Sequence, residues 1–133
     1  MAVVGFVKML AAAFSFCIFR VSKFKIKLYL CTQVEITEMK KERETANKYR
    51  QQALEGDLMA MNNMGVCYAQ GIGVVEDHVM AFQWYMKAAE LGDIYACYNV
   101  AECYYQGDGV ELDFERALHW YLIAAEKGDV QSQ

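Results

Sequence analysis

The hydrophobic and polar positions of this chain follow one pattern twice, in segments that begin at Gly56 and Gly92. In the first segment, apolar residues at helical spacing predict a helix over residues 58–69. A second apolar stripe predicts another helix that begins near Asp77, and the next segment repeats this pair with its second helix near Asp113. Two-helix units that recur every 36 residues bury their apolar faces by stacking on their neighbours, so the pattern predicts an all-α helical solenoid.

The residues that recur in both segments all have a structural interpretation. Gly-Asp pairs at 56–57, 92–93 and 128–129 are expected to end one helix and to cap the next. The Gly-x-Gly between the two helices turns the chain, because the strand and the further glycine of a nucleotide-binding loop are missing. Aromatic residues that alternate with small ones at helical spacing are expected in the core rather than in a ligand cage. The residues with expected structural roles are Gly65, Tyr68, Gly71, Gly73, Asp77, Ala81, Trp84, Tyr85, Tyr104, Gly107, Gly109, Asp113, Ala117, Trp120 and Tyr121.

The first 33 residues form a hydrophobic and then basic segment that the repeat does not explain. Residues 2–19 are apolar except for Lys8 and Ser15, which suits a signal peptide, a membrane anchor or a buried helix that caps the solenoid. They can also be an upstream extension that does not belong to the protein. Residues 23–30 alternate basic and apolar side chains, a strand-like period. Localisation follows from residues 2–19: membrane-associated or secreted if they act as anchor or signal, and otherwise cytoplasmic.

The solenoid is expected to occupy residues 34–133. Tyr49 and Ala53 correspond to Tyr85 and Ala89 of the next unit, so residues 34–55 are expected to form the second helix of a degenerate half repeat. Lys48 stands where the later units have tryptophan, as suits a terminal unit with one wetter face. The full repeats are then 56–91 and 92–127, and residues 128–133 are the truncated start of a further unit.

Charge is divided unevenly along the chain. Residues 1–55 carry 10 Lys/Arg against 5 Asp/Glu, and residues 56–133 carry 3 against 12. An acidic solenoid repels phosphates, so nucleic acid is not an expected partner. The basic arm is either a solvated helix face or a surface for anionic lipid.

The cysteines and histidines do not form a recognisable chemical site. The 5 cysteines have no Cys-x-x-Cys or Cys/His ligand spacing, so we expect no metal, no cofactor and no disulfide framework. Cys67 and Cys103 occupy the same place in successive units and suit small buried apolar positions. His78 and His119 are out of phase with the repeat, so a cysteine-dependent hydrolase is only a remote alternative and we expect no enzyme.

The recurrent residues resemble a known repeat family. Gly-Asp-x-x-Ala, Tyr-x-x-Gly-x-Gly-Val and Asp-x-x-x-Ala-x-x-Trp-Tyr-x-x-Ala-Ala-Glu, over residues 56–127, are similar to the Sel-one-like repeat, a relative of the tetratricopeptide repeat. The resemblance implies a right-handed α-solenoid of antiparallel helix pairs. It also implies a scaffold or adaptor role in protein complexes, in signalling or protein quality control.

We therefore expect a non-catalytic scaffold that binds a protein partner. The alternative is a membrane-tethered assembly or quality-control factor that uses residues 2–19. The C-terminal end, left without a following repeat, is expected to self-associate, bind a partner domain or pack against the N-terminal segment. Unrepeated positions on the first helices, which generally line the concave side of such solenoids, are the candidate partner contacts: Asn62, Val66, Tyr98, Glu102 and Tyr105.

Overall fold

The computed structural model describes the backbone of residues 2–132 and the side chains of residues 22–129. The described backbone is helical without strands, as the repeat pattern predicts. Its helices are α1 (Ala2–Leu54), α2 (Leu58–Gln70), α3 (His78–Glu90), α4 (Ile94–Gln106) and α5 (Phe114–Ser132). The chain divides into an N-terminal unit, residues 1–39, and a compact unit, residues 40–133, and each is described by itself.

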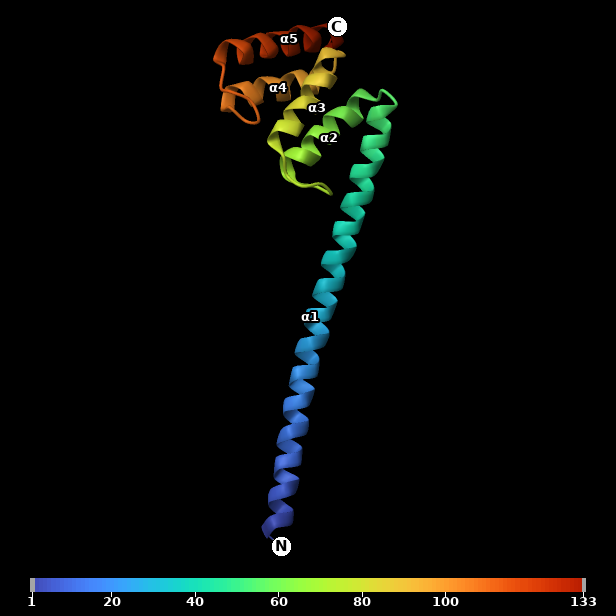
Figure 1. The fold of residues 1–133 in the computed structure, drawn as a ribbon, viewed down its shortest axis with the longest axis vertical. Helices are drawn as coiled ribbons and strands as arrows, with labels where there is room; N and C mark the ends of the chain where they lie inside the picture. Colours follow the sequence, from blue (N-terminus) through green and yellow to red (C-terminus); the bar gives the residue numbers. More distant parts are fainter. Residues whose placement is uncertain (1, 133) are drawn as a thin grey trace. The chain divides into compact units, whose positions relative to one another are not determined.

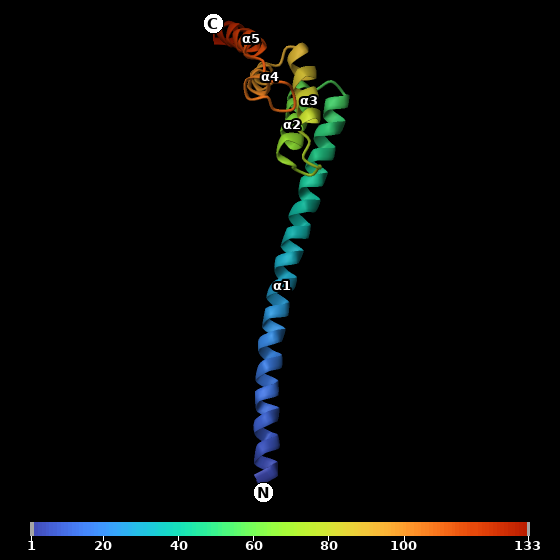
Figure 2. The same cartoon turned by 60° about the vertical axis from the view of Figure 1, so that its left-hand side comes forward.

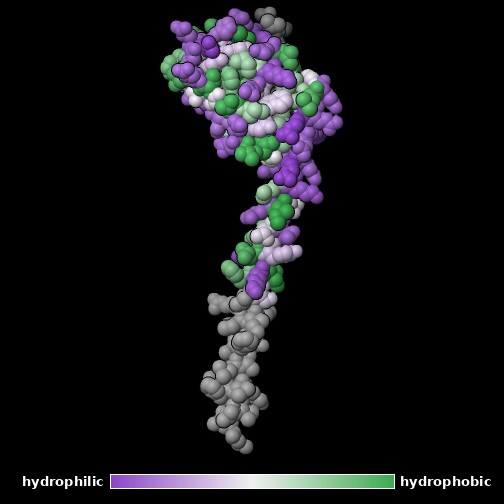
Figure 3. All heavy atoms as spheres, viewed as in Figure 1, coloured by the Kyte–Doolittle hydropathy of each residue, from purple (hydrophilic) through white to green (hydrophobic). Residues whose placement is uncertain are grey.

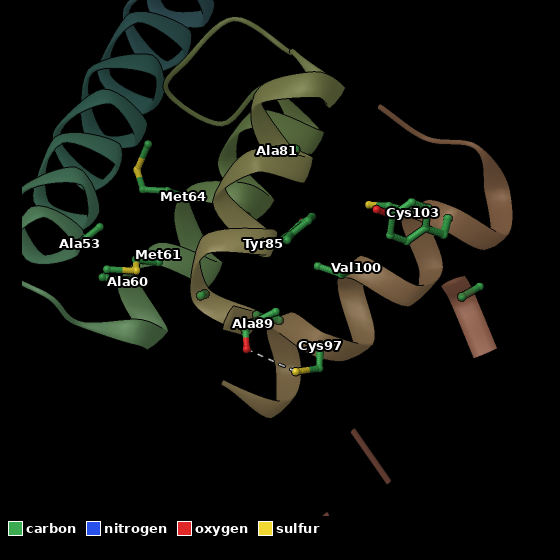
Figure 4. Packing of buried hydrophobic residues seen from close by; sticks show 14 residues of the cluster. Ala53, Ala60, Met61, Met64, Ala81, Tyr85, Ala89, Cys97, Val100 and Cys103 are labelled. Carbon is green, nitrogen blue, oxygen red and sulfur yellow. Dashed lines mark hydrogen bonds between the residues drawn. The ribbon is translucent and has the colours of Figure 1, made fainter. Parts of the chain in front are cut away.

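The compact unit is a stack of helices in sequence order. Helix α2 packs against α3, α3 against α4, and α4 against α5 (Figures 1 and 2). Small residues dominate its core, so the helices approach closely, and Tyr85 of α3 fills the space between its neighbours (Figure 4). The buried cluster consists of Ala53, Ala60, Met61, Met64, Ala81, Tyr85, Ala88, Ala89, Ala96, Cys97, Val100, Cys103, Tyr104 and Ala117.

The end of α1 belongs to this core. Ala46 and Ala53 are buried, and Tyr49 packs against the cluster. Ala53 lies beside the first turns of α2 in Figure 4. The compact unit begins at Lys40 rather than at residue 34, and the half repeat over residues 34–55 stays a prediction.

Aspartates cap the helices of the repeats. Asp57 accepts hydrogen bonds from the amides of Met59 and Ala60, and Asp77 accepts them from Val79 and Met80. Asp93 and Asp113 each accept one amide in the same way, so these four predicted caps are confirmed. Each cap contributes about 1 kcal/mol, because it pairs an amide that the first turn leaves free.

Two sequence-based expectations are wrong. Residues 23–30 belong to α1 rather than to a strand, because a helix satisfies its backbone hydrogen bonds internally and a lone strand does not. Gly128 and Asp129 lie inside α5 and do not start a new helix. Gly56 and Gly92 have φ values of 101° and 103°, which end their helices, and the helices that follow them pack into the core, whereas Gly128 keeps a helical backbone within α5.

The tryptophans of the repeat lie at the edge of the core rather than at its centre. Trp84 and Trp120 are half-buried and pack against the cluster, while the neighbouring Tyr85 is buried. The ammonium group of Lys87 lies 5.4 Å from the ring centroid of Trp84, so this ring also meets a surface cation. In the first repeat, the expected aromatic core thus consists of the buried ring of Tyr85 and the peripheral ring of Trp84.

The glycine turns of the repeats press against the preceding second helix. Gly71 and Gly73 have φ values of 69° and 70°, and a Cβ added at Gly73 would collide with the carbonyl of Glu42 in α1. In the next unit, a Cβ at Gly109 would collide with the carbonyl of His78. Glycine therefore permits both the left-handed backbone and the close contact between successive units.

We predict that Gly71→Ala and Gly73→Ala have unequal costs. The two residues share nearly the same φ, so each substitution incurs roughly 1–2 kcal/mol of left-handed strain. At Gly73 the new methyl also meets helix backbone, whereas at Gly71 the nearest atom is the Glu76 Cβ at 3.4 Å. Urea unfolding should give an additional cost of roughly 1–3 kcal/mol for Gly73→Ala. Equal unfolding free energies for the two variants would show that the turn does not depend on this contact.

A histidine links the two full repeats at the same place. The Nε2 atom of His78 lies 2.8 Å from Glu76 Oε1, and its Nδ1 atom lies 2.7 Å from Asp108 Oδ1 in the following glycine turn. The hydrogen bond to Glu76 and the charge of Asp108 raise the pKa of His78 above its ordinary value of 6.5. The protonated ring therefore joins the start of α3 to the turn before α5.

We predict that this link weakens as the pH rises. Because the folded-state pKa of His78 is raised, its contribution is complete below about pH 6.5 and is lost as the pH passes the folded-state pKa. The difference in melting temperature between the native chain and His78→Gln should shrink from about pH 6 to about pH 8.5. Titration of the ring by NMR should give a pKa above 6.5 that falls in Asp108→Asn. An unchanged pKa in that variant would refute the link.

In the N-terminal unit, the described side chains of residues 22–39 are all exposed. Large apolar residues such as Phe24, Tyr29 and Met39 keep more than half of their surface in solvent. Figure 3 shows hydrophobic and hydrophilic side chains together on this part of α1. Within the described part of the chain, no helix is both long and apolar enough to span a membrane. The side chains of residues 2–19 lie outside the described part, so their role as signal, anchor or cap stays a prediction.

Candidate protein-binding face

The first helices of the two full repeats meet through a pair of amides. The Nδ2 atom of Asn99 in α4 donates to Oδ1 of Asn62 in α2 at 2.8 Å. Both side chains are half-buried, which leaves part of each amide at the surface. Since each amide has further donors and acceptors, the pair can offer hydrogen bonds to an approaching polypeptide.

Next to this pair, α4 and α5 form an aromatic and acidic cluster. Tyr98 is 52% exposed and packs edge-to-face on Tyr121, with ring centroids 5.6 Å apart. The hydroxyl of Tyr121 donates to Oε1 of Glu102, whose Oε2 accepts from Gln106 Nε2 at 3.0 Å. Partial burial and the hydrogen bond to Glu102 raise the pKa of Tyr121, so its phenol stays protonated and keeps donating. The cluster thus holds a carboxylate, bonded to Tyr121 and Gln106, beside the aromatic pair of Tyr98 and Tyr121.

Tyr85 and Tyr121 occupy equivalent positions in the two repeats but differ in their burial and contacts. Tyr85 lies on Gly65, so closely that a Cβ at Gly65 would collide with the ring, and burial raises the pKa of Tyr85 to about 12. The next repeat has Ala101, a buried residue, in place of Gly65. That repeat also has Glu102 at the position after this alanine, which gives Tyr121 a hydrogen-bond acceptor. The ring is buried in the first repeat, where α4 also packs on α3, and half-exposed in the second.

The remaining predicted contacts lie at the edges of this face. Tyr105 is 54% exposed and packs edge-to-face on Phe114, with ring centroids 5.5 Å apart. Val66 is half-buried and packs against the core. The structure therefore joins Tyr98 and Glu102 into one cluster, ties Asn62 to α4, and leaves Tyr105 in a second aromatic pair.

Sequence reasoning missed two members of this face. Asn99 adjoins Tyr98 and is a polar residue inside an apolar helix, but the repeat pattern does not distinguish it as a contact. Because Tyr121 repeats Tyr85, the pattern predicts only a structural role for it. The replacement of Val66 by Glu102 in the second repeat was the available signal, since a carboxylate beside a tyrosine changes what that ring can bond.

The thiols of Cys67 and Cys103, which recur in the two repeats, do not have the surroundings of catalytic nucleophiles. Cys67 and Cys103 are buried, and burial raises the pKa of both thiols, that of Cys103 to about 11. A nucleophilic cysteine needs a lowered pKa, because the thiolate is the reactive form. Within the described part of the chain, no group of three or more His, Cys, Asp and Glu side chains is arranged to hold a metal ion.

Comparison with known proteins identifies the repeats. The family model described as Sel1 repeat matches residues 58–93 and 94–129. A Sel1 repeat protein from Oxalobacter formigenes is 38% identical, with a TM-score of 0.63, over 68% of this chain and 36% of its own. The protein c5321, a protective antigen of uropathogenic Escherichia coli with an SLR fold, is 37% identical with the same TM-score, over 68% of this chain and 19% of its own.

A third structure, cysteine rich protein B of Helicobacter pylori, shares the fold with a TM-score of 0.63 and 23% identity, over 65% of each chain. No curated protein gives a significant match. The chain spans about a fifth and about a third of the two more similar structures, so their overall roles do not transfer to it. The matched repeats cover more than half of the sequence, and their helices stack as in the solved relatives. The chain therefore belongs to the Sel1 repeat family.

Proposed function

We propose that this protein is a non-catalytic scaffold that binds a protein partner through the first helices of its repeats. Sel1 repeat proteins are generally interaction scaffolds of this kind. The observation that carries the proposal is the cluster of Tyr98, Glu102 and Tyr121, in which a held carboxylate adjoins exposed aromatic surface. This cluster does not repeat between the two units, so stacking of the repeats does not account for it.

The chemistry of the face suits a polypeptide ligand. Tyrosine gives a large contact area at a small cost in side-chain entropy, and Tyr98 and Tyr105 are each about half exposed. The amides of Asn62 and Asn99 add hydrogen-bonding capacity beside the rings. Glu102 supplies negative charge, so a partner segment with lysine or arginine fits this face best.

We predict that a photoreactive amino acid at Tyr98 or Tyr105 forms adducts with a protein partner in producing cells. The same replacement at Tyr29, an exposed tyrosine of the N-terminal unit, serves as the matched control. Purified partner should bind Tyr98→Ala at least tenfold more weakly than the native chain, a loss of about 1.4 kcal/mol. Equal adduct formation at all three tyrosines, or unchanged affinity of Tyr98→Ala, would refute this binding face.

The second candidate is a membrane-tethered form of the same scaffold. The sequence of residues 2–19 suggests the tether, and the exposed apolar side chains of residues 22–39 are interleaved with Lys23, Lys25 and Lys27. Lysines beside apolar residues favour the headgroups of anionic lipids. In this form the solenoid would work as an assembly or quality-control factor at a membrane surface.

We predict that the full chain floats with vesicles that contain phosphatidylserine. The double variant Lys25→Glu and Lys27→Glu should bind these vesicles more weakly, because it replaces attraction to the headgroups by repulsion. Glu35→Gln, which raises the charge of the same segment, is the control and should not weaken binding. Equal flotation of the native chain and the double variant would rule out lysine-directed binding, and no flotation of either would rule out the tether.

A further inference from the structure

A second surface, beside the tyrosine cluster, lies along α5 and begins at Phe114. Phe114, Leu118 and Leu122 are spaced four residues apart and therefore share one face of the helix. They are 59%, 59% and 54% exposed. A continuous apolar stripe of this kind on a packed helix marks a contact site.

The preceding repeat shows how the equivalent face is used. The residues one repeat earlier than Leu118 and Leu122 are Phe82 and Met86 of α3, and both pack against the core. The ring of Tyr104 in α4 packs edge-on against Phe82, with centroids 5.3 Å apart. The thiol of Cys97 in α4 lies 3.8 Å from the carbonyl oxygen of Ala89 (Figure 4). This face of α3 thus contacts α4, the first helix of the next repeat.

Alanines at equivalent positions of α3 and α5 differ in exposure, because α4 covers the face of α3. Ala88 and Ala89 of α3 are 0% and 3% exposed. Their equivalents in α5 are Ala124, which is half-buried, and Ala125, which is exposed. Among the described residues, none takes the place on α5 that α4 takes on α3.

We propose that this face of α5 binds an amphipathic helix of a partner protein that has the pattern of α4. In α4 the contacting positions are Cys97, Val100 and Tyr104, so the partner helix should carry a small, an aliphatic and an aromatic residue at this spacing. The exposed carboxylates of Glu115 and Glu126 on α5 favour basic residues at the edges of that helix. A second copy of this chain is a poorer occupant, since its α2 and α4 already pack in its own stack.

The binding partner can be tested with a surrogate. The probe is a fluorescein-labelled peptide with the sequence of α4, Ile94–Gln106, stapled as a helix between positions 98 and 102, which lie outside the buried cluster and contact Tyr121 of α5 in the native stack. Fluorescence anisotropy with the full chain should show saturable binding. Leu118→Lys should weaken it at least tenfold, because the charge enters the apolar contact. A peptide with Tyr104→Ala should also bind more weakly.

Leu54→Lys is the matched control, because Leu54 is 72% exposed at the end of α1 and lies outside this face. It should bind the peptide as the native chain does, and circular dichroism should show all variants folded. Tyr98→Ala should also leave peptide binding unchanged, which separates this site from the proposed tyrosine face. The proposal is overturned if no saturable binding occurs, or if Leu118→Lys and Leu54→Lys bind alike. Self-association of the native chain that depends on Leu118 would instead assign the face to a second copy.

Discussion

The close approach of each glycine turn to the preceding second helix is the contact on which the stack depends. Gly73 lies on the backbone of Glu42, and Gly109 lies on the backbone of His78. Each contact sets the distance between one unit and the next at a point where no side chain fits. The alanine-rich core follows from this spacing, because helices held so close leave room for small residues and a few rings. The first of these contacts also involves α1, whose last turns pack on the repeats as a further second helix would.

On this shared frame the two repeats have diverged in one place. Gly65 admits the ring of Tyr85 into the core, whereas Ala101 and Glu102 accompany a Tyr121 that is half-exposed and hydrogen-bonded. The substitution costs the second repeat little, because its tyrosine still contacts α4. It gives that repeat a carboxylate and aromatic surface that the first repeat lacks. The candidate face thus differs from the first repeat at Tyr98, Ala101 and Glu102, which stand where that repeat has Asn62, Gly65 and Val66.

The exposure of the apolar face of α5 also results from how the repeats stack. A solenoid unit presents on its second helix the surface that the next first helix covers. Helix α3 has that cover, and the exposed Leu118 and Leu122 of α5 have none among the described residues. The two proposed surfaces thus differ in origin. The tyrosine cluster contains residues that depart from the repeat, whereas the face of α5 is the surface that every second helix of a solenoid presents to the next unit.

The sequence alone determined the repeat, the helix pairs and the caps, because helical periodicity and an aspartate before a helix are local properties that need no partner. It also indicated Tyr98, Glu102 and Tyr105 as candidate partner contacts, since they depart from the repeat. Only the tertiary structure decided that residues 23–30 are helical and that α5 continues through Gly128, because local alternation and a Gly-Asp pair carry no information about packing neighbours. It alone placed Tyr121 on Glu102 and Asn99 on Asn62, because contacts between helices depend on how close their backbones lie.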